Sequence, residues 1–398
     1  MTGSRDEGMN GVPVVCFRAG EGGSVNRLRQ LEQFGQSVWL DYVRRELLTG
    51  GGLKALIADD GVKGVTSNPA IFEKAIAEGA EYRDALEMAT RSGETDPERI
   101  YERLAIEDIA MAADQMAGVH AATGGRDGFV SLEVSPRLAH DTEATVTEGR
   151  RLWRAVDRPN LMIKVPATPA GLPAVERLIA EGINVNVTLL FAVGVYREVA
   201  HAYRRGLEQR VRAGQPVDHI SSVASFFVSR IDTEVDAILE RRMGEAASTD
   251  ERCLLEALRG KAAIANARLA YAAYLELTAS EHWRVLEASG ARTQRVLWAS
   301  TGTKNRAYPD TLYVDELIGP DTVNTMPPAT LEAFRHHGMP QERLMGNPEE
   351  AREVMARLAA AGIDMEAVTA RLLEDGVRLF DEAYGRLLGA IQRARRAA

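Results

Sequence analysis

The strongest constraint on the fold is a regular alternation of short apolar segments with helical patterns from residue 37 onward. The apolar segments are rich in branched residues and too short for helix faces, so we expect buried strands. The expected strands are 37–42, 64–68, 128–135, 161–167, 184–191, 219–227, 295–300 and 322–326. Amphipathic segments between them predict helices, among others at 97–116, 142–156, 169–180, 194–213 and 250–278. About eight such units predict a single (β/α)8 TIM barrel, an α/β fold with a closed parallel sheet.

A doubly wound open sheet is the main alternative fold, and it normally carries a glycine fingerprint after its first strand. No G-x-G-x-x-G motif is present in the chain. Gly50, Gly51 and Gly52 follow a helical pattern and lack the lysine and hydroxyl spacing of a phosphate-binding loop. They therefore predict a turn that ends a helix.

The chain of 398 residues is long enough for one barrel with additions or for two domains. Residues 1–27 are glycine-rich and irregular, and we expect a mobile extension there, followed by one barrel domain over 28–398. The end of this domain predicts two additional C-terminal helices at 349–361 and 365–391. We expect them to pack on the barrel as an appendage near its mouth, with a separate binding domain as the alternative. The apolar side of the second helix is expected to contain Leu372, Leu373, Val377, Leu379 and Phe380.

Composition excludes several classes of protein. The net charge of −9 argues against nucleic-acid binding, which depends on clustered lysine and arginine. Cys16 and Cys253 lie far apart, so we expect neither a disulfide framework nor a cysteine zinc site, as is typical of a cytoplasmic protein. We find no signal-peptide pattern and no apolar run of the roughly 18 residues that span a membrane. The seven histidines lack metal-binding spacings, so no metal site is expected.

Lys164 is an ionisable residue inside an expected buried strand. Loss of hydration disfavours the charged form of an amine, and a neutral amine can attack a ketone or aldehyde to form a Schiff base. The alternative is a lysine at a strand end whose ammonium group reaches solvent or pairs with a carboxylate. Lys164 alone does not decide between these interpretations, so the neighbouring strands must be considered.

Polar residues lie toward the carboxyl ends of seven expected strands, which is where parallel barrels carry their active sites. A cap, a turn or a satisfied core polar group would explain any single one of them. The same pattern at seven strand ends instead predicts a shared pocket, and an amine with two carboxylates suits imine chemistry. The residues are Asp41, Thr66 with Asn68, Glu133 with Ser135, Lys164, Asn186 with Thr188, Ser225 and Ser300.

Several segments resemble transaldolases, in particular the longer actinobacterial type and the transaldolase half of fused transaldolase/glucose-6-phosphate isomerase proteins. They cover most of residues 37–340 in the expected order. The resemblance implies a single (β/α)8 barrel without metal or organic cofactor. One departure is Ser135, where relatives with shorter chains usually have aspartate. The matching segments are SVWLDYVRREL, GVTSNPAIFEKAI, VSLEVSPRLAHDTEAT, RPNLMIKVPATPAGLPA, INVNVTLLF, ISSVASFFVSRIDTEVD, GKAAIANARLAY, LWASTGTKN and YPDTLYVDELIGPDTVNTMP.

The resemblance also implies a reaction and catalytic roles. A dihydroxyacetone unit would pass from sedoheptulose 7-phosphate or fructose 6-phosphate to glyceraldehyde 3-phosphate or erythrose 4-phosphate in the non-oxidative pentose phosphate pathway. Lys164 would form the Schiff base with the ketose. Glu133 would act as acid and base through a water held with the help of Thr188. Asp41 would take the proton from the hydroxyl on the fourth carbon, so that the bond between the third and fourth carbons breaks.

Substrate binding is expected to use other side chains at the barrel mouth. Arg230 and Ser300 match the phosphate binders of the family, whereas Lys304 matches less closely because the loop is longer. A surface ion pair of Arg230 with Asp232 or Glu234 is the alternative. The remaining expected substrate-binding residues are Asn68, Thr66, Asn186, Ser225 and Phe227.

Three other functions can be compared with this one. A Schiff-base aldolase that releases its product to water would share the lysine, but relatives of that kind carry glutamine and tyrosine in place of Glu133 and Phe227. A non-catalytic sugar-phosphate sensor would be expected to have lost at least one of the predicted catalytic residues. A specialised transaldolase acting on another sugar phosphate stays open, because acceptor choice depends on loop shape. We expect sugar-phosphate substrates, no nucleic-acid or membrane partner, and a monomer or homodimer.

Overall fold

The computed structural model describes residues 26–91, 93–346 and 348–397. Eight parallel strands close into a barrel in chain order, which confirms the fold predicted from the sequence. The closing pair is β1 with β8, so the sheet has no open edge. The strands are β1 (Gln36–Asp41), β2 (Gly64–Thr66), β3 (Phe129–Glu133), β4 (Leu161–Pro166), β5 (Val185–Leu190), β6 (Ser222–Phe227), β7 (Arg295–Ala299) and β8 (Thr322–Met326).

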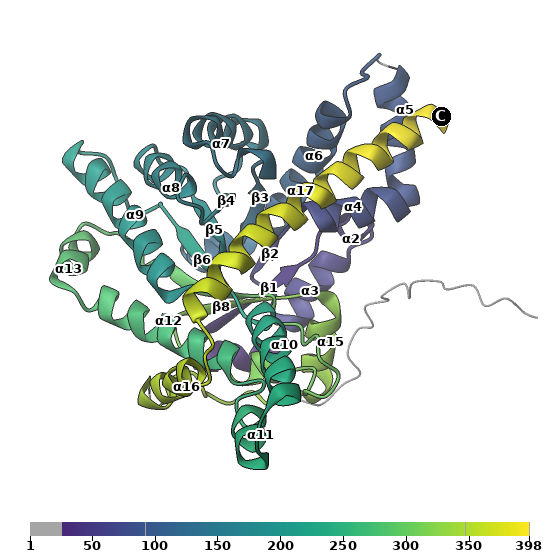
Figure 1. The fold of residues 1–398 in the computed structure, drawn as a ribbon. Helices are drawn as coiled ribbons and strands as arrows, with labels where there is room; N and C mark the ends of the chain where they lie inside the picture. Colours follow the sequence, from purple (N-terminus) through teal and green to yellow (C-terminus); the bar gives the residue numbers. More distant parts are fainter. Residues whose placement is uncertain (1–25, 92, 347, 398) are drawn as a thin grey trace, which may run out of the picture.

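Helices surround the barrel and connect its strands (Figure 1). Within the described part of the chain, no helix is both long enough and apolar enough to cross a membrane. The α-helices are α1 (Arg27–Gln30), α2 (Arg45–Thr49), α3 (Gly52–Asp60), α4 (Pro69–Glu78), α5 (Arg83–Arg91), α6 (Pro97–Ala122), α7 (Thr142–Val156), α8 (Gly171–Ala180), α9 (Val193–Arg212), α10 (Ser229–Glu245), α11 (Thr249–Glu256), α12 (Ala262–Thr278), α13 (Glu281–Ala288), α14 (Leu312–Asp315), α15 (Pro328–His337), α16 (Pro348–Ala360) and α17 (Met365–Ala397). Short 3₁₀ turns are η1 (Leu31–Phe34), η2 (Ala80–Tyr82) and η3 (Pro136–Leu138).

The prediction of one helix over 250–278 is wrong, because the segment forms two helices, α11 and α12. Gly260 between them adopts a left-handed conformation with φ of +66°. Its N–H donates a hydrogen bond to Asp236 over 2.9 Å, and the N–H of Ala263 donates to Asp232 over 2.8 Å. These two N–H groups therefore donate to side chains of the neighbouring helix α10. The amphipathic pattern of the sequence continues across the break, which is why it predicted one helix.

The glycine turn near residue 50 is confirmed. Helix α2 ends at Thr49, Gly51 has φ of +78°, and α3 begins at Gly52. The predicted extension over 1–27 lies outside the described residues apart from its last two. Of these, Asn26 caps α1 by accepting hydrogen bonds from the first N–H groups of the helix.

The two predicted C-terminal helices are confirmed as α16 and α17. Helix α17 lies across the carboxyl end of the barrel, which we call the mouth (Figure 1), and contacts α4, α5, α6, α10, η3 and β5. Among the side chains of α17 itself, Leu372 and Phe380 are buried, whereas Leu379 is 43% exposed. The placement of Leu379 on the apolar side is therefore wrong, because successive helical residues point about 100° apart and Phe380 occupies the inward direction.

A buried ion pair stabilises the opposite, amino end of the barrel. The carboxylate of Asp127 lies 2.8 Å from the guanidinium of Arg295, and both side chains are almost inaccessible to solvent. Ser37 and Trp39 of β1 also donate hydrogen bonds to Asp127, over 2.8 and 3.0 Å. Since Arg295 begins β7 and Asp127 precedes β3, this cluster joins three strands inside the barrel.

We expect Asp127→Ala to lower the free energy of unfolding by about 3–5 kcal/mol, because it leaves the Arg295 charge buried without its partner. The measurement is chemical denaturation followed by circular dichroism. Glu276→Ala is the matched control, because Glu276 forms an ion pair with Arg197 in which both side chains are at least 40% exposed. Exposed pairs contribute little. Equal destabilisation by the two substitutions would contradict the importance of the buried pair.

Candidate active site

Three predicted site residues stand side by side because of strand register. Glu133 of β3 is the register partner of Lys164 in β4, and Lys164 is the register partner of Asn186 in β5. Register partners in adjacent parallel strands point to the same face of the sheet. The three side chains therefore form a row across neighbouring strands near the mouth of the barrel.

Lys164 is 4% exposed, so the part of the alternative in which its ammonium group reaches solvent is wrong, whereas the part in which it pairs with a carboxylate is present as a contact with Glu133. Its Nζ donates a hydrogen bond to the backbone carbonyl of Ser67 over 3.0 Å and lies 3.3 Å from Oε2 of Glu133. The contact with Glu133 is an ion pair rather than a well-directed hydrogen bond, since Oε2 has no hydrogen-bond partner among the described residues. The ring of Phe380 on α17 covers the amine, with its centroid 5.8 Å from Nζ.

The two predicted catalytic carboxyls share an environment poor in water. Burial raises the pKa of Glu133, and the nearby charge of Asp41 raises it further, whereas Lys164 opposes the shift. Asp41 has part of its surface open at the mouth, yet loss of water also raises its pKa. The Thr66 hydroxyl donates a hydrogen bond to Asp41 over 2.7 Å. A raised pKa suits a carboxyl group that must both hold and release a proton near neutral pH.

Asn186 is held in a short chain of polar side chains. Ser225 donates a hydrogen bond to its Oδ1 over 2.6 Å, and its Nδ2 donates to Ser131 over 3.0 Å. Thr188 lies two residues further along β5, next to a register shift in that strand, and is buried. Its hydroxyl has no hydrogen-bond partner among the described residues, so it resembles Glu133 in carrying a buried oxygen with bonding capacity left.

Two cations face the same part of the mouth. Arg230 and Lys304 both lie near enough to Asp41 to lower its pKa. Partial burial lowers the pKa of Arg230, and its guanidinium lies over the ring of Phe227 at 5.2 Å. The alternative of a surface ion pair for Arg230 is wrong within the described residues. Asp232 accepts hydrogen bonds from Tyr313 and Ala263, and Glu234 pairs with Arg371.

Hydrogen bonds hold together the two segments that carry Arg230 and Lys304. Ser229, at the start of α10, lies beside Ser300 after β7, with their hydroxyl oxygens 3.0 Å apart. Tyr308, further along the same loop, donates to Asp236 of α10 over 2.6 Å. Ser300 itself has φ of +55°, a strained conformation for a residue with a side chain. These contacts fix the loop of Ser300 and Lys304 relative to Arg230.

Asn68 has a local structural role as well as a place at the mouth. Its Oδ1 accepts a hydrogen bond from the N–H of Ile71 and caps α4. Sequence analysis missed two groups that contact Lys164, the carbonyl of Ser67 and the ring of Phe380. A backbone carbonyl carries no residue signature, and the only sequence signal for Phe380 was its place in an apolar helix face.

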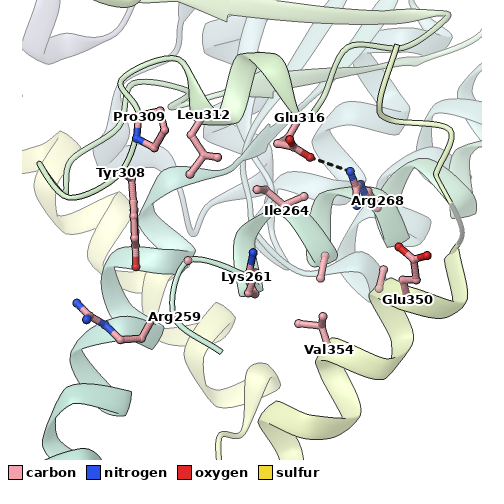
Figure 2. Close-up of a pocket in the computed structure, with 13 residues that line it drawn as sticks. Arg259, Lys261, Ile264, Arg268, Tyr308, Pro309, Leu312, Glu316, Glu350 and Val354 are labelled. Carbon is pink, nitrogen blue, oxygen red and sulfur yellow. Dashed lines mark hydrogen bonds and ion pairs between the residues drawn. The ribbon is translucent and has the colours of Figure 1, made fainter. Parts of the chain in front are cut away.

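A cavity of about 340 Å³ lies away from this site, between α12, α16 and the segment before α14 (Figure 2). An ion pair of Arg268 with Glu316, at 3.0 Å, forms part of its wall. All the predicted site residues are described by the structure, and none of them lines this cavity. The cavity is therefore separate from the row of Glu133, Lys164 and Asn186.

Comparison with known proteins agrees with the geometry of the site. The family model described as transaldolase/fructose-6-phosphate aldolase matches residues 38–391. A protein named transaldolase from Saccharopolyspora erythraea is 49% identical over 92% of this chain and 97% of its own length. Transaldolases from Thiobacillus denitrificans and Trichodesmium erythraeum are 48% and 46% identical over 92% of this chain, which covers 100% and 97% of their lengths. The chain therefore belongs to the transaldolase/fructose-6-phosphate aldolase family.

Proposed function

We propose that this chain is a transaldolase, which transfers a dihydroxyacetone unit between sugar phosphates through a Schiff base on Lys164. The observation that carries the proposal is the enclosed amine within β4, 4% exposed and 3.3 Å from the carboxylate of Glu133. An amine in this position can attack the carbonyl of a ketose, and the adjacent carboxyl can move the protons that this step requires. The donors would be sedoheptulose 7-phosphate or fructose 6-phosphate, within the non-oxidative pentose phosphate pathway.

Glu133 and Thr188 are assigned to formation of the imine. When Nζ of Lys164 adds to the ketose carbonyl, the carbinolamine must lose its hydroxyl as water. Glu133 gives the proton that this hydroxyl needs, through a water that Thr188 helps to hold. These assignments are supported by the burial of Oε2 of Glu133 and of the Thr188 hydroxyl, because both oxygens can still accept a hydrogen bond.

Asp41 is assigned to carbon-carbon bond cleavage. Its ionised carboxylate accepts the proton of the hydroxyl on the fourth carbon, and the electrons of the broken bond pass into the protonated imine. The aldose phosphate leaves, while the three-carbon unit stays on Lys164 until an acceptor aldose arrives. Asn68, Asn186 and Ser225 are assigned to the hydroxyls of this unit, with Thr66 orienting Asp41 through their 2.7 Å hydrogen bond.

Arg230, Ser300 and Lys304 are assigned to the phosphate, and Phe227 to the support of Arg230. The support is the joint location of two cations near Asp41 and the contacts that fasten their segments together. Residues Glu133 and Phe227 favour a transferase over a Schiff-base aldolase by their resemblance to transaldolases. We further propose a cytoplasmic location, and the prediction of a monomer or homodimer stays a prediction.

We expect borohydride, added with fructose 6-phosphate, to trap a three-carbon adduct on Lys164, as peptide mass mapping would show. Lys164→Arg should abolish trapping and transfer, because a guanidinium stays protonated and cannot attack a carbonyl. Lys74→Arg, at an exposed position on α4, is the matched control and should keep both. An adduct on another lysine, or none with the wild-type protein, would end the Schiff-base proposal.

We expect Arg230→Ala to raise KM for fructose 6-phosphate far more than KM for unphosphorylated fructose. The loss should be about 2–4 kcal/mol if the contact with phosphate is desolvated. Steady-state kinetics with both sugars provide the measurement. Arg158→Ala is the control, because Arg158 pairs with Asp114 at an exposed site. The same weakening of both sugars by Arg230→Ala would assign Arg230 to general support of the pocket.

We expect Lys304→Gln to move the acidic limb of the kcat/KM profile to higher pH. Asp41 must be ionised to act as the base, and Lys304 lowers its pKa, so removal of this cation raises the pH at which activity is lost. Lys63→Gln is the control at the amino end of the barrel, where Lys63 pairs with Glu32 at 3.3 Å. A limb that stays in place, or moves to lower pH, would contradict the expected effect of Lys304 on the ionisation of Asp41.

A further inference from the structure

Helix α17 crosses the ends of three consecutive strands with residues spaced four apart. Gly376 packs on Leu189 of β5, the ring of Phe380 covers Lys164 of β4, and Tyr384 lines a small pocket together with Ser135 after β3. Four residues advance a helix by about 6 Å, close to the spacing of about 4.8 Å between adjacent strands. One face of α17 thus runs along the part of the barrel rim formed by the ends of β5, β4 and β3 (Figure 1).

The contact of Gly376 with Leu189 requires the absence of a side chain on the helix. A Cβ at position 376 would lie 2.8 Å from a methyl group of Leu189, well inside van der Waals contact. Leu189 has φ of +58°, next to the register shift of β5, and is 2% exposed. The helix therefore approaches β5 closely on one side of Phe380.

Tyr384, one helical turn after Phe380, makes the contacts on the C-terminal side. Its ring packs edge-on against Tyr101 at 5.6 Å, and the guanidinium of Arg137 lies over it at 5.3 Å. Arg137 also forms an ion pair with Asp381 over 3.4 Å. Phe380 is consequently held in place from both directions along the helix, with 6% of its surface exposed.

We propose that Phe380 is a positioning residue that shields the three-carbon unit on Lys164 from solvent after cleavage, so that its reacting carbon attacks an acceptor aldehyde rather than taking a proton. This inference rests on the proposed function and deepens it. Phe380 contributes no proton and no charge. Its apolar ring lies 5.8 Å from Nζ and takes the place of solvent water that could protonate the carbon that held the broken bond.

The reaction that Phe380 suppresses is release of the three-carbon unit. After cleavage, a proton would add to the carbon that held the broken bond and restore the imine. Water would then add to the imine carbon, the carbon-nitrogen bond would break, and dihydroxyacetone and the free amine of Lys164 would form. Transfer avoids the protonation, because the same carbon attacks the acceptor aldehyde instead. The imine of the longer ketose is then hydrolysed through the water assigned to Glu133 and Thr188, in the reverse of its formation.

The row of residues that carries Phe380 lies over one part of the barrel rim, while other parts of α17 contact α4 and α10. The row of Gly376, Phe380 and Tyr384 faces β5, β4 and β3. The predicted phosphate-binding side chains instead follow β6 and β7, and Asp41 ends β1. The acceptor can therefore reach the reacting carbon from the side of the cations while Phe380 stays over the amine.

The test compares two rates for each variant with fructose 6-phosphate as donor. One is transfer to erythrose 4-phosphate, and the other is release of dihydroxyacetone without an acceptor. We expect Phe380→Ala to raise the ratio of release to transfer by about tenfold, which equals about 1.4 kcal/mol between the two barriers. Phe380→Leu should keep most of the wild-type ratio, and Phe380→Val should fall between Leu and Ala, because the apolar cover shrinks in that order.

Leu379→Ala is the matched control, since this neighbouring side chain on α17 is 43% exposed and should leave the ratio unchanged. The Leu and Val variants keep the test decisive if the Ala variant does not fold. Equal loss of both rates, or a constant ratio through the series, would show that Phe380 only stabilises the fold and would overturn the inference. Failure of the wild-type protein to transfer or to be trapped by borohydride would instead refute the proposed function.

Discussion

The parallel register of β3, β4 and β5 is the constraint on which the site depends. It makes Glu133, Lys164 and Asn186 neighbours, although they come from separate segments of the chain. A shift of one residue in β4 would turn Lys164 toward the surrounding helices and place an apolar residue beside Glu133. The closed barrel resists such a shift, because every strand is hydrogen-bonded on both sides and no strand can move alone.

Charge at the two ends of the barrel is balanced in different ways. At the amino end, Asp127 and Arg295 form a pair with further hydrogen bonds from Ser37 and Trp39, so the charges are fully satisfied. At the mouth, two carboxyls face one enclosed amine, and the pKa of each carboxyl is raised. A carboxyl group with a raised pKa, such as Asp41 or Glu133, can exchange a proton more readily than Asp127, whose charge is neutralised by Arg295. The amino end therefore supports the fold, and the mouth supports chemistry.

The fold could be predicted, and a candidate site proposed, because both leave local signals in the sequence. Alternating patterns located the strands, and polar residues near their ends located Asp41, Glu133 and Lys164. The break at Gly260 could not be predicted, because it depends on Asp232 and Asp236 in another helix accepting the N–H groups of this segment. The position of Phe380 over Lys164 is likewise a contact between distant parts of the chain. Its helix face was visible in the sequence, but not the surface that this face covers.

The serine at position 135 can be understood through the same helix. Transaldolases with shorter chains usually have aspartate there, two residues after the glutamate. In this chain Ser135 and Tyr384 of α17 line the same small pocket, and the guanidinium of Arg137 lies over the ring of Tyr384. A carboxylate at 135 would add negative charge near Glu133, whose pKa is already raised by burial and by Asp41. A neutral hydroxyl at 135 adds no such charge, and its place beside Tyr384 puts it at the contact between α17 and the segment after β3.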